Sequence, residues 1–151
     1  MFSETDAGEA AVMELGAITC QIQLILRAHN GTLNRVISDD KGTSMLLSFR
    51  DAADAVRGAL EIKTSVQQIP VRPPQAQFQT AMGITTGVVF IGCIGGIHRQ
   101  EYTMHGSVVN FAARMMCCPL IKYTGGMLCD RKTREETSEL GLVYKEQEPQ
   151  Q

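Results

Sequence analysis

A short stretch of the chain, Glu101 to Met116 (EYTMHGSVVNFAARMM), sets a strand, a turn and a helix in immediate succession. EYTM is typical of the end of a β-strand, because aromatic and β-branched residues favour strands. HGS is typical of a turn, and Ser107 is predicted to cap the helix that follows, since its hydroxyl can accept a first-turn N–H. The rest of the chain is organised around this junction.

The helix predicted from Val108 to Cys118 is nearly all apolar and has two exceptions, Asn110 and Arg114. Residues four apart lie on one face of a helix, one turn above the other. An unpaired charge in apolar surroundings is costly, so Arg114 needs an anionic partner or a solvated cleft. Two readings stay open. Arg114 ties the helix to a carboxylate elsewhere, or the amide and the guanidinium together bind polyanionic oxygens, which suits their donors.

The bulk composition limits the class of protein. At 151 residues the chain fits one domain with a sizeable core. Its net charge of −2, with no basic cluster, argues against nucleic acid as a partner. No apolar run approaches the length of a membrane span, and the acidic start MFSETDAGEA lacks the pattern of a signal peptide. Five cysteines without a CxxC pair indicate reduced thiols, and therefore a cytoplasmic location.

The first half of the chain is predicted to be two helices around a hairpin. Apolar residues at helical spacing predict a helix from Ala10 to His29, and Asn30-Gly31 supplies its stop. TLNRVIS and TSMLLSF are predicted strands, joined by a turn from Asp39 to Gly42. Asp51 is predicted to cap a second helix, which ends in the proline-rich connector IPVRPPQ.

The second half is predicted to be mainly strands. Residues 78–94 (FQTAMGITTGVVFIGCI) are rich in β-branched side chains and broken by glycines, which predicts two strands bent at Thr86-Gly87. After the junction helix we expect a short strand MLCD, a small helix starting near Arg131 and a last strand from Leu142 to Tyr144. The tail EQEPQQ, residues 146–151, has the composition of disorder.

This order of elements predicts an α+β fold, a ferredoxin-like antiparallel sheet with helices packed on it. Residues 1–145 are expected to form a single domain, because no internal repeat or boundary interrupts them. A ferredoxin-like arrangement needs a strand before the first helix, whereas this chain begins directly with a helix. We therefore expect the first strand to be missing and the domain to be N-terminally truncated.

Three motifs, GTLNRVISDDKG, GVVFIGCIGG and EYTMHGSVVNFAARMM, resemble in order and spacing the catalytic domain of class III nucleotidyl (adenylate and guanylate) cyclases. The greatest likeness is to the second cyclase half of soluble, bicarbonate-responsive adenylyl cyclases. It runs from the first residue to about Thr133, and the third motif is its specific part. The resemblance implies an active site between two halves paired head to tail. One half holds two metal ions through two Asp residues, and the other supplies base recognition and an Asn and Arg that stabilise the transition state.

Matching by motif position implies roles for four residues of this chain. Asn110 would orient the ribose, and Arg114 would donate to the charge that builds on the phosphoryl oxygens. Thr103 falls where the soluble-type enzymes carry a Thr facing the adenine edge. Arg35 stands in place of the adenine-reading Lys, an exchange that is not neutral, although a cation here favours ATP over GTP. The open alternative for Arg35 is a strand residue that faces solvent.

Asp39 lies four residues beyond Arg35, where the metal-binding halves carry their second Asp. A carboxylate at a hairpin turn suits Mg²⁺, so Asp39 is a candidate metal ligand. Asp-Asp-Lys-Gly is also an ordinary surface turn. That reading is favoured, because the strand that would carry the first metal Asp is absent. The Mg²⁺ or Mn²⁺ ions are therefore expected to be held mainly by the partner half.

The resemblance implies half of an adenylate cyclase active site. With a complementary half, in the same longer chain or as a dimer, the domain would convert ATP to cyclic AMP and pyrophosphate in intracellular signalling, as a phosphorus–oxygen lyase. Two alternatives remain open. One is a catalytically silent cyclase-like module that dimerises and binds nucleotide. The other is an α+β ligand-binding domain with no link to nucleotides.

Overall fold

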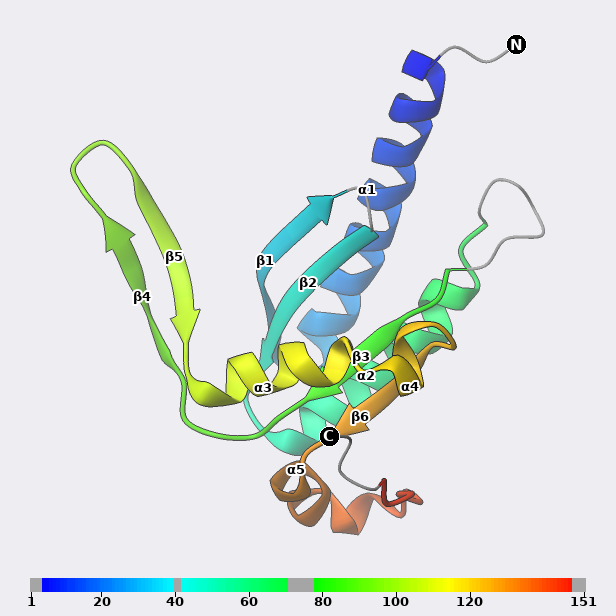
Figure 1. Ribbon diagram of the computed structural model, residues 1–151, viewed down its shortest axis with the longest axis vertical. Helices are drawn as coiled ribbons and strands as arrows, with labels where there is room; N and C mark the ends of the chain where they lie inside the picture. The colour runs from blue at the N-terminus through cyan, green and yellow to red at the C-terminus, as the bar shows by residue number, and fades with distance from the viewer. Residues whose placement is uncertain (1–3, 40–41, 71–77, 148–151) are drawn as a thin grey trace.

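The computed structural model describes residues 4–39, 42–70 and 78–147 (Figure 1). Its elements follow in the order α1 (Glu4–Ala28), β1 (Gly31–Asp39), β2 (Gly42–Phe49), α2 (Ala52–Gln67), β3 (Ala81–Ile84), β4 (Phe90–Gly95), β5 (Gln100–His105), α3 (Ser107–Met116), α4 (Pro119–Lys122), β6 (Gly126–Cys129), α5 (Arg131–Glu136) and the 3-10 helix η1 (Ser138–Leu140). This mixture of helices and short ladders confirms the predicted α+β class.

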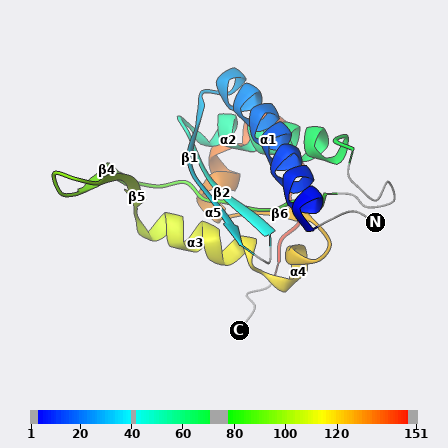
Figure 2. The same cartoon turned by 90° about the horizontal axis from the view of Figure 1, so that it is seen from above.

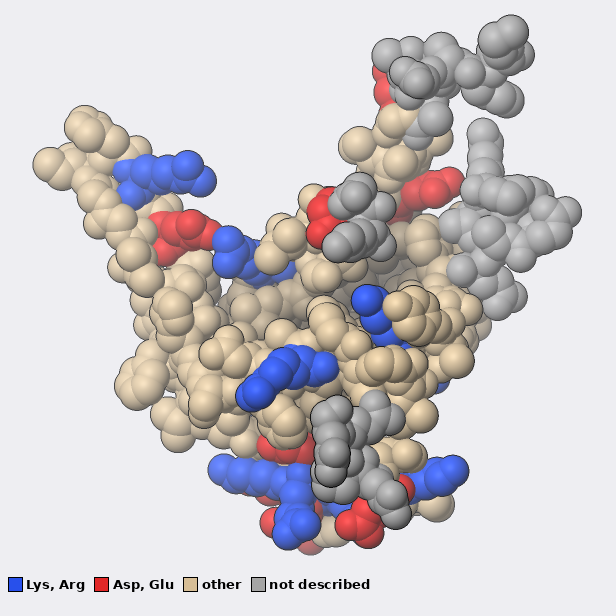
Figure 3. Space-filling view, viewed as in Figure 1, with Lys and Arg blue, Asp and Glu red and all other residues tan. Residues whose placement is uncertain are grey.

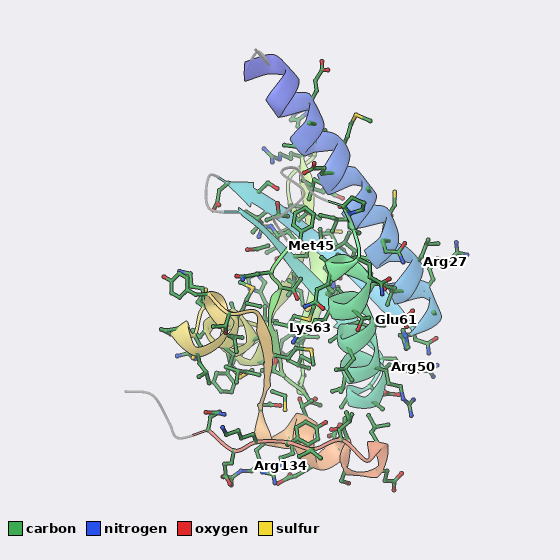
Figure 4. The ribbon with its side chains drawn as sticks, turned by 90° about the vertical axis from the view of Figure 1, so that its right-hand side faces the viewer. Arg27, Met45, Arg50, Glu61, Lys63 and Arg134 are labelled. Atoms are coloured by element: carbon green, nitrogen blue, oxygen red, sulfur yellow. The ribbon has the colours of Figure 1, made fainter. Side chains whose placement is uncertain are left out.

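Helices α1 and α2 pack on one face of the β1–β2 hairpin and enclose the core with it (Figures 1 and 2). The buried members are Ile18, Ile22, Ile25 and Leu26 from α1 and Ile62 and Val66 from α2. The hairpin contributes partly buried Leu33, Met45, Leu47 and Phe49. Met45 is labelled beside α2 in Figure 4. Burying each large aliphatic side chain is worth about 1.5–3 kcal/mol, so this cluster is the main source of stability.

The strands form three separate two-stranded ladders in the described residues. β1–β2 and β4–β5 are antiparallel, as predicted, whereas the β3–β6 pair is parallel and so departs from the predicted antiparallel arrangement. The reason lies in the connection: the chain leaves β3, forms the β4–β5 hairpin, and returns to β6 through α3. A crossover that contains a helix brings the next strand back in the same direction.

Helix α3, which follows the strand–helix junction, packs very closely on the β3–β6 ladder. A Cβ built on Gly83 would lie 2.2 Å from the carbonyl oxygen of Ala112, so only glycine permits this approach. The hydroxyl of Thr85 donates to the carbonyl of Val108 at 2.8 Å and fastens the first turn of α3 to the end of β3. α3 is therefore held on β3 by a close approach at Gly83 and by a side-chain-to-backbone hydrogen bond from Thr85.

Two predicted helix boundaries are confirmed. Asp51 caps α2, and its carboxylate accepts a hydrogen bond from the backbone N–H of Asp54 at 2.8 Å. Asn30 follows α1 with a positive φ of 54°, the left-handed conformation that ends helices, and its amide donates to the Asp54 carboxylate at 3.1 Å.

Three other predictions of local structure are wrong. Ser107 does not cap α3, because Gly106 holds the cap position and Ser107 is already the first helical residue. The same helix ends at Met116 and not at Cys118, since Pro119 starts a separate short helix. Residues 142–144 form no strand. The hydroxyl of Tyr144 instead bonds the buried hydroxyl of Thr137 at 2.5 Å.

Parts of some predictions lie outside the described residues. These are the centre of the β1–β2 turn (40–41), most of the proline-rich connector (71–77) and the end of the tail (148–151). The expectation that no apolar run approaches the length of a membrane span needs correction. Within the described residues, Gly8–Ala28 of α1 is long and apolar enough to cross a membrane, with a mean hydropathy of 1.3. Core helices of folded domains have the same composition, and the inner face of α1 is buried in the core.

Candidate active site

Asn110 and Arg114 project from the exposed side of α3. The guanidinium of Arg114 stacks on the ring of Phe111, 5.9 Å from its centroid. No carboxylate of the described residues lies within ion-pair distance of Arg114, and no described side chain bonds the Asn110 amide. The reading of Arg114 as a structural residue tied to a carboxylate is therefore not supported. Two groups with several hydrogen-bond donors face solvent together, one turn apart.

Arg35 on β1 forms an ion pair with Glu101 on β5, with 3.0 Å between Nη2 and Oε1. Both side chains are about half exposed, at 56% and 55%, so this bond places the guanidinium more than it stabilises the fold. Thr103 lies two residues beyond Glu101 on the same strand, and therefore on the same face. The structure thus brings Arg35 beside β5, and the nucleotide-binding roles of Arg35 and Thr103 stay predictions.

Sequence reasoning missed Glu101, for which the sequence offers only a partial signal. Glu101 and Thr103 lie on one face of β5, and Thr103 and Arg35 were both assigned to base recognition. A β-bulge between Leu33 and Arg35 shifts the register of β1 at this point and re-aims the side chains that follow. Neither the bulge nor the contact between β1 and β5 can be read from spacing.

Asp39 is the last residue of β1 and is exposed. It shares a strand face with Arg35, because residues four apart on a strand point the same way. Within the described ranges, no three His, Cys, Asp or Glu side chains form a group that could hold a metal ion. The described residues therefore do not fit a two-metal site by themselves, and Asp39 as a ligand stays a prediction.

The β4–β5 hairpin extends away from the body of the domain and carries large apolar side chains in solvent (Figure 1). Phe90 is 75% exposed, Ile94 58% and Tyr102 51%, while Ile97 at the tip is 98% exposed. Phe90 and Ile94 lie on one face of the β4–β5 ladder, whereas Tyr102, which pairs with Cys93, lies on the other. We call these four residues, on both faces and the tip of the hairpin, the hairpin patch. Exposed apolar patches of this kind mark sites of protein contact. β5 runs directly into α3, so the hairpin patch and the Asn110–Arg114 pair belong to one continuous segment.

Among the described residues, the face shown in Figure 3 carries no broad positive patch that would indicate a polyanion-binding surface. Single Lys and Arg side chains are scattered over the central elements, and side chains of both signs gather over α5 at the lower end. A nucleotide here would be bound by a few placed donors and not by a broad positive field.

A buried hydroxyl network closes the far end of the β3–β6 ladder. The Asp130 carboxylate caps α5, accepting from the N–H of Thr133 at 2.9 Å, and the Thr133 hydroxyl bonds that of Thr86 at 2.7 Å. Beside it, burial raises the pKa of the Cys129 thiol, the neighbouring Asp130 carboxylate raises it further, and Arg134 opposes both. The network fixes β6 and is structural.

The sequence profile of the adenylate and guanylate cyclase catalytic domain matches residues 41–120. This range includes Thr103, Asn110 and Arg114 and begins after Arg35 and Asp39. Adenylate cyclase type 10 of Rattus norvegicus is 31% identical over 150 residues, which cover 97% of this chain and 9% of that protein. The human protein of the same name is 30% identical with the same coverage. The chain thus spans about a tenth of the length of these relatives.

Solved structures show the same fold. A bacterial light-regulated adenylyl cyclase superposes with a TM-score of 0.71 at 20% identity, covering 89% of this chain and 70% of that one. The guanylyl cyclase Cya2 superposes with a TM-score of 0.69 at 22% identity, covering 85% and 67%. At such identities the likeness concerns the fold, and it confirms the cyclase-like α+β architecture.

Proposed function

Because the chain belongs to the adenylate and guanylate cyclase catalytic domain family, we propose that it forms one half of an adenylate cyclase active site. A second cyclase half, in the same longer chain or in another molecule, would complete the site. The observation that carries this proposal is the Asn110–Arg114 pair, exposed on α3 and free of ion pairs and side-chain hydrogen bonds in the described part of the chain. These residues have donors to spare for a ligand.

In the proposed reaction the ribose 3′-oxygen of ATP attacks the α-phosphorus. The O3′–H proton passes to water as a bond forms between O3′ and the α-phosphorus, the bond to the bridging oxygen breaks, and pyrophosphate leaves with that bond's electron pair. Negative charge builds on the phosphoryl oxygens, where the planar guanidinium of Arg114 can donate two parallel hydrogen bonds. Asn110, one turn earlier, would hold the ribose so that O3′ faces the phosphorus. Mg²⁺ or Mn²⁺, held mainly by the partner half, would neutralise phosphate charge.

The adenine would lie against β1 and β5. Adenine presents an N6 amino donor beside ring-nitrogen acceptors, whereas guanine presents an O6 acceptor at the corresponding position. The hydroxyl of Thr103 can accept from N6, and Arg35 can donate to a ring nitrogen. Glu101 forms an ion pair with Nη2 of Arg35, and its carboxylate would repel guanine O6. This arrangement supports ATP over GTP as the substrate.

The hairpin patch is the surface we propose for the complementary half. Its apolar side chains need cover, and they lie on the segment that leads into the catalytic pair. A stable interface buries about 800 Å² on each partner, with an apolar core and a polar rim. Pairing here would bring the second half against α3.

All five cysteines are free, which supports a function in the reducing cytoplasm.

Two observations favour a second candidate, a catalytically silent module that pairs with a cyclase half and binds nucleotide. The described residues contain no group of three or more His, Cys, Asp or Glu side chains that could hold a metal ion, and Arg35 replaces a Lys that the family resemblance places there. In that case ATP would raise the melting temperature, since specific binding stabilises the folded state. No cyclic AMP would form with any complementary half.

The deciding experiment is an assay of cyclic AMP formation by this chain mixed with a metal-binding cyclase half. Arg114→Ala should lower kcat about 10²–10³-fold, the usual loss for one transition-state donor. Arg57→Ala, an exposed Arg on α2, is the matched control and should leave the rate unchanged. An active pair that is indifferent to Arg114→Ala would refute the assignment of this residue. Nucleotide binding without turnover would establish the silent module.

A further inference from the structure

Helix α1 has an apolar face that no described part of the chain covers. Its inner face is buried in the core, but Val12, Met13 and Leu24 on the other side are 71%, 76% and 62% exposed. Smaller exposed residues connect them. We define the outer face of α1 as Val12, Met13, Gly16, Ala17, Cys20 and Leu24.

The outer face lacks the charges that normally keep a surface helix in water. Glu9 and Arg27 are exposed at its two ends, and among the exposed residues between them none is charged and Gln23 is the one polar residue. A helix with one buried face ordinarily carries charged and polar side chains on the opposite one. An exposed apolar strip of this length therefore indicates a contact surface.

The N-terminal half of α1 also projects beyond the β1–β2 hairpin (Figure 1). Among the described side chains of α1, Ile18 is the first that is buried. The described side chains before it are at most half-buried, so these turns gain little from packing within the described domain, and isolated helical segments of such length are marginal in water. A partner along the outer face would bury these turns and stabilise their helical state.

Lipid is the poorer candidate for this partner. The inner face of α1 belongs to the protein core, so lipid cannot surround the helix. Helices that lie in a membrane surface carry several Lys or Arg residues on their polar face. The outer face has a single basic residue at its boundary, Arg27, which projects away from the body in Figure 4.

We propose that the outer face of α1 binds the outer face of α1 in a second copy of this chain, with the two helices antiparallel. About five helical turns separate Glu9 from Arg27, so both side chains project in the same direction. An antiparallel pair that crosses near Ile18 sets Glu9 of each copy level with Arg27 of the other. The same symmetry sets Val12 level with Leu24, and Gly16 level with Cys20.

Each feature of the outer face has a place in this pair. The small side chains at the crossing let the two backbones approach closely, while Met13 and Leu24 supply apolar area on either side. Unlike charges meet at both ends, whereas a parallel pair would set Glu9 beside Glu9 and Arg27 beside Arg27. The contact uses α1, which packs on α2 and β1, and leaves the Asn110–Arg114 pair on α3 unused.

The test is the dimer dissociation constant of the 151-residue chain, measured by sedimentation velocity over a range of concentrations. Arg27→Glu sets like charges against each other at both ends and should weaken the dimer about ten- to hundredfold. The double variant Glu9→Arg with Arg27→Glu restores both pairs and should return the constant to within about threefold of the original. Leu24→Asp should leave only monomer. Val143→Asp, at an apolar residue that is 99% exposed, is the matched control.

Three results would overturn the proposal: a monomer at every concentration, a dimer that ignores Arg27→Glu, or a double variant that stays weak. Flotation of the chain with phosphatidylcholine–phosphatidylserine vesicles, abolished by Leu24→Asp, would assign the outer face to a membrane instead. The assay with a complementary half is an independent readout. Leu24→Asp should leave that activity unchanged, so failure of the α1 dimer and failure of the cyclase proposal are told apart.

Discussion

The two halves of the domain differ in how they are covered. In the first half, α1, α2 and the β1–β2 hairpin bury six large aliphatic side chains among themselves. In the second half, every residue of β4 is exposed and α3 has no buried residue at all. Both halves are rich in apolar residues, so composition does not explain the contrast.

The first half is stabilised by its own core, whereas the second half presents surfaces that a partner would cover. The first half has the arrangement of an ordinary core, with two helix faces on one hairpin face. The second half keeps apolar side chains in solvent on a projecting hairpin, which is unfavourable in an isolated molecule, and its helix α3 presents solvated donors that are open to a ligand. The proposed catalytic residues all lie on, or contact, this second half.

The sharpest test of the contrast compares one core residue with one residue of the hairpin patch. Ile25→Ala, at a side chain only 2% exposed, should lower the free energy of unfolding by about 2–5 kcal/mol, because it removes methylenes and leaves a cavity. Phe90→Ala should change it by less than about 0.5 kcal/mol, as expected of surface positions. Urea unfolding followed by circular dichroism measures both. Similar losses in the two variants would contradict the division.

Gly83→Ala tests whether the second half depends on the seat of α3. The new methyl group would meet the Ala112 carbonyl oxygen at 2.2 Å, so α3 must move. We expect a loss of about 1–3 kcal/mol in unfolding free energy, typical of overpacking, together with reduced cyclase activity. Gly92→Ala is the matched control, because a Cβ there meets nothing within 4 Å. An unaffected Gly83 variant would show that α3 is loosely seated.

Glu101→Gln tests base selection. The amide keeps the size of the side chain but loses the charge that holds Arg35 and repels guanine O6. The ratio of kcat/KM for ATP over GTP should fall about three- to tenfold, within the range of one hydrogen-bonded contact. Glu135→Gln, exposed on α5, is the control. An unchanged ratio would leave Glu101 as a surface ion-pair residue.

The smallest expected effect concerns thiol reactivity. Burial and the neighbouring Asp130 carboxylate raise the pKa of the Cys129 thiol, with Arg134 opposing them, so less thiolate is present at a given pH. Cys129 should react several-fold more slowly with iodoacetamide at mildly alkaline pH than exposed Cys93, as read by peptide mass spectrometry. Because the pKa of the Cys129 thiol is higher in the folded state than in the unfolded chain, the stability that the neutral thiol contributes is fully present below the unfolded-state pKa. It is lost as pH rises through the folded-state pKa. Equal rates for the two thiols would contradict this.

Periodicity predicted the elements of the first half well, because their burial is one-sided and local. Ile18, Ile22 and Ile25 face one core, and Asp51 caps its helix through a contact three residues away. Pattern could not predict the parallel β3–β6 ladder, which depends on a crossover, or the Arg35–Glu101 pair, which joins distant strands. The strand predicted at Leu142–Tyr144 does not form, because Tyr144 is held by a hydrogen bond with the Thr137 hydroxyl and not by a neighbouring strand. Pattern could not predict this tertiary contact either.

The parallel β3–β6 ladder has a consequence for how the chain folds. The β1–β2 hairpin pairs residues that are near in sequence, and such contacts close quickly. Ala81 pairs with Gly126, so this ladder closes a loop that contains the whole hairpin and α3. The entropy of such a closure makes the ladder slow to form. During synthesis β3 must wait until β6 has left the ribosome, and the apolar hairpin stays exposed for that interval. The second half of the domain is therefore the last to become native and the most open to aggregation before it does.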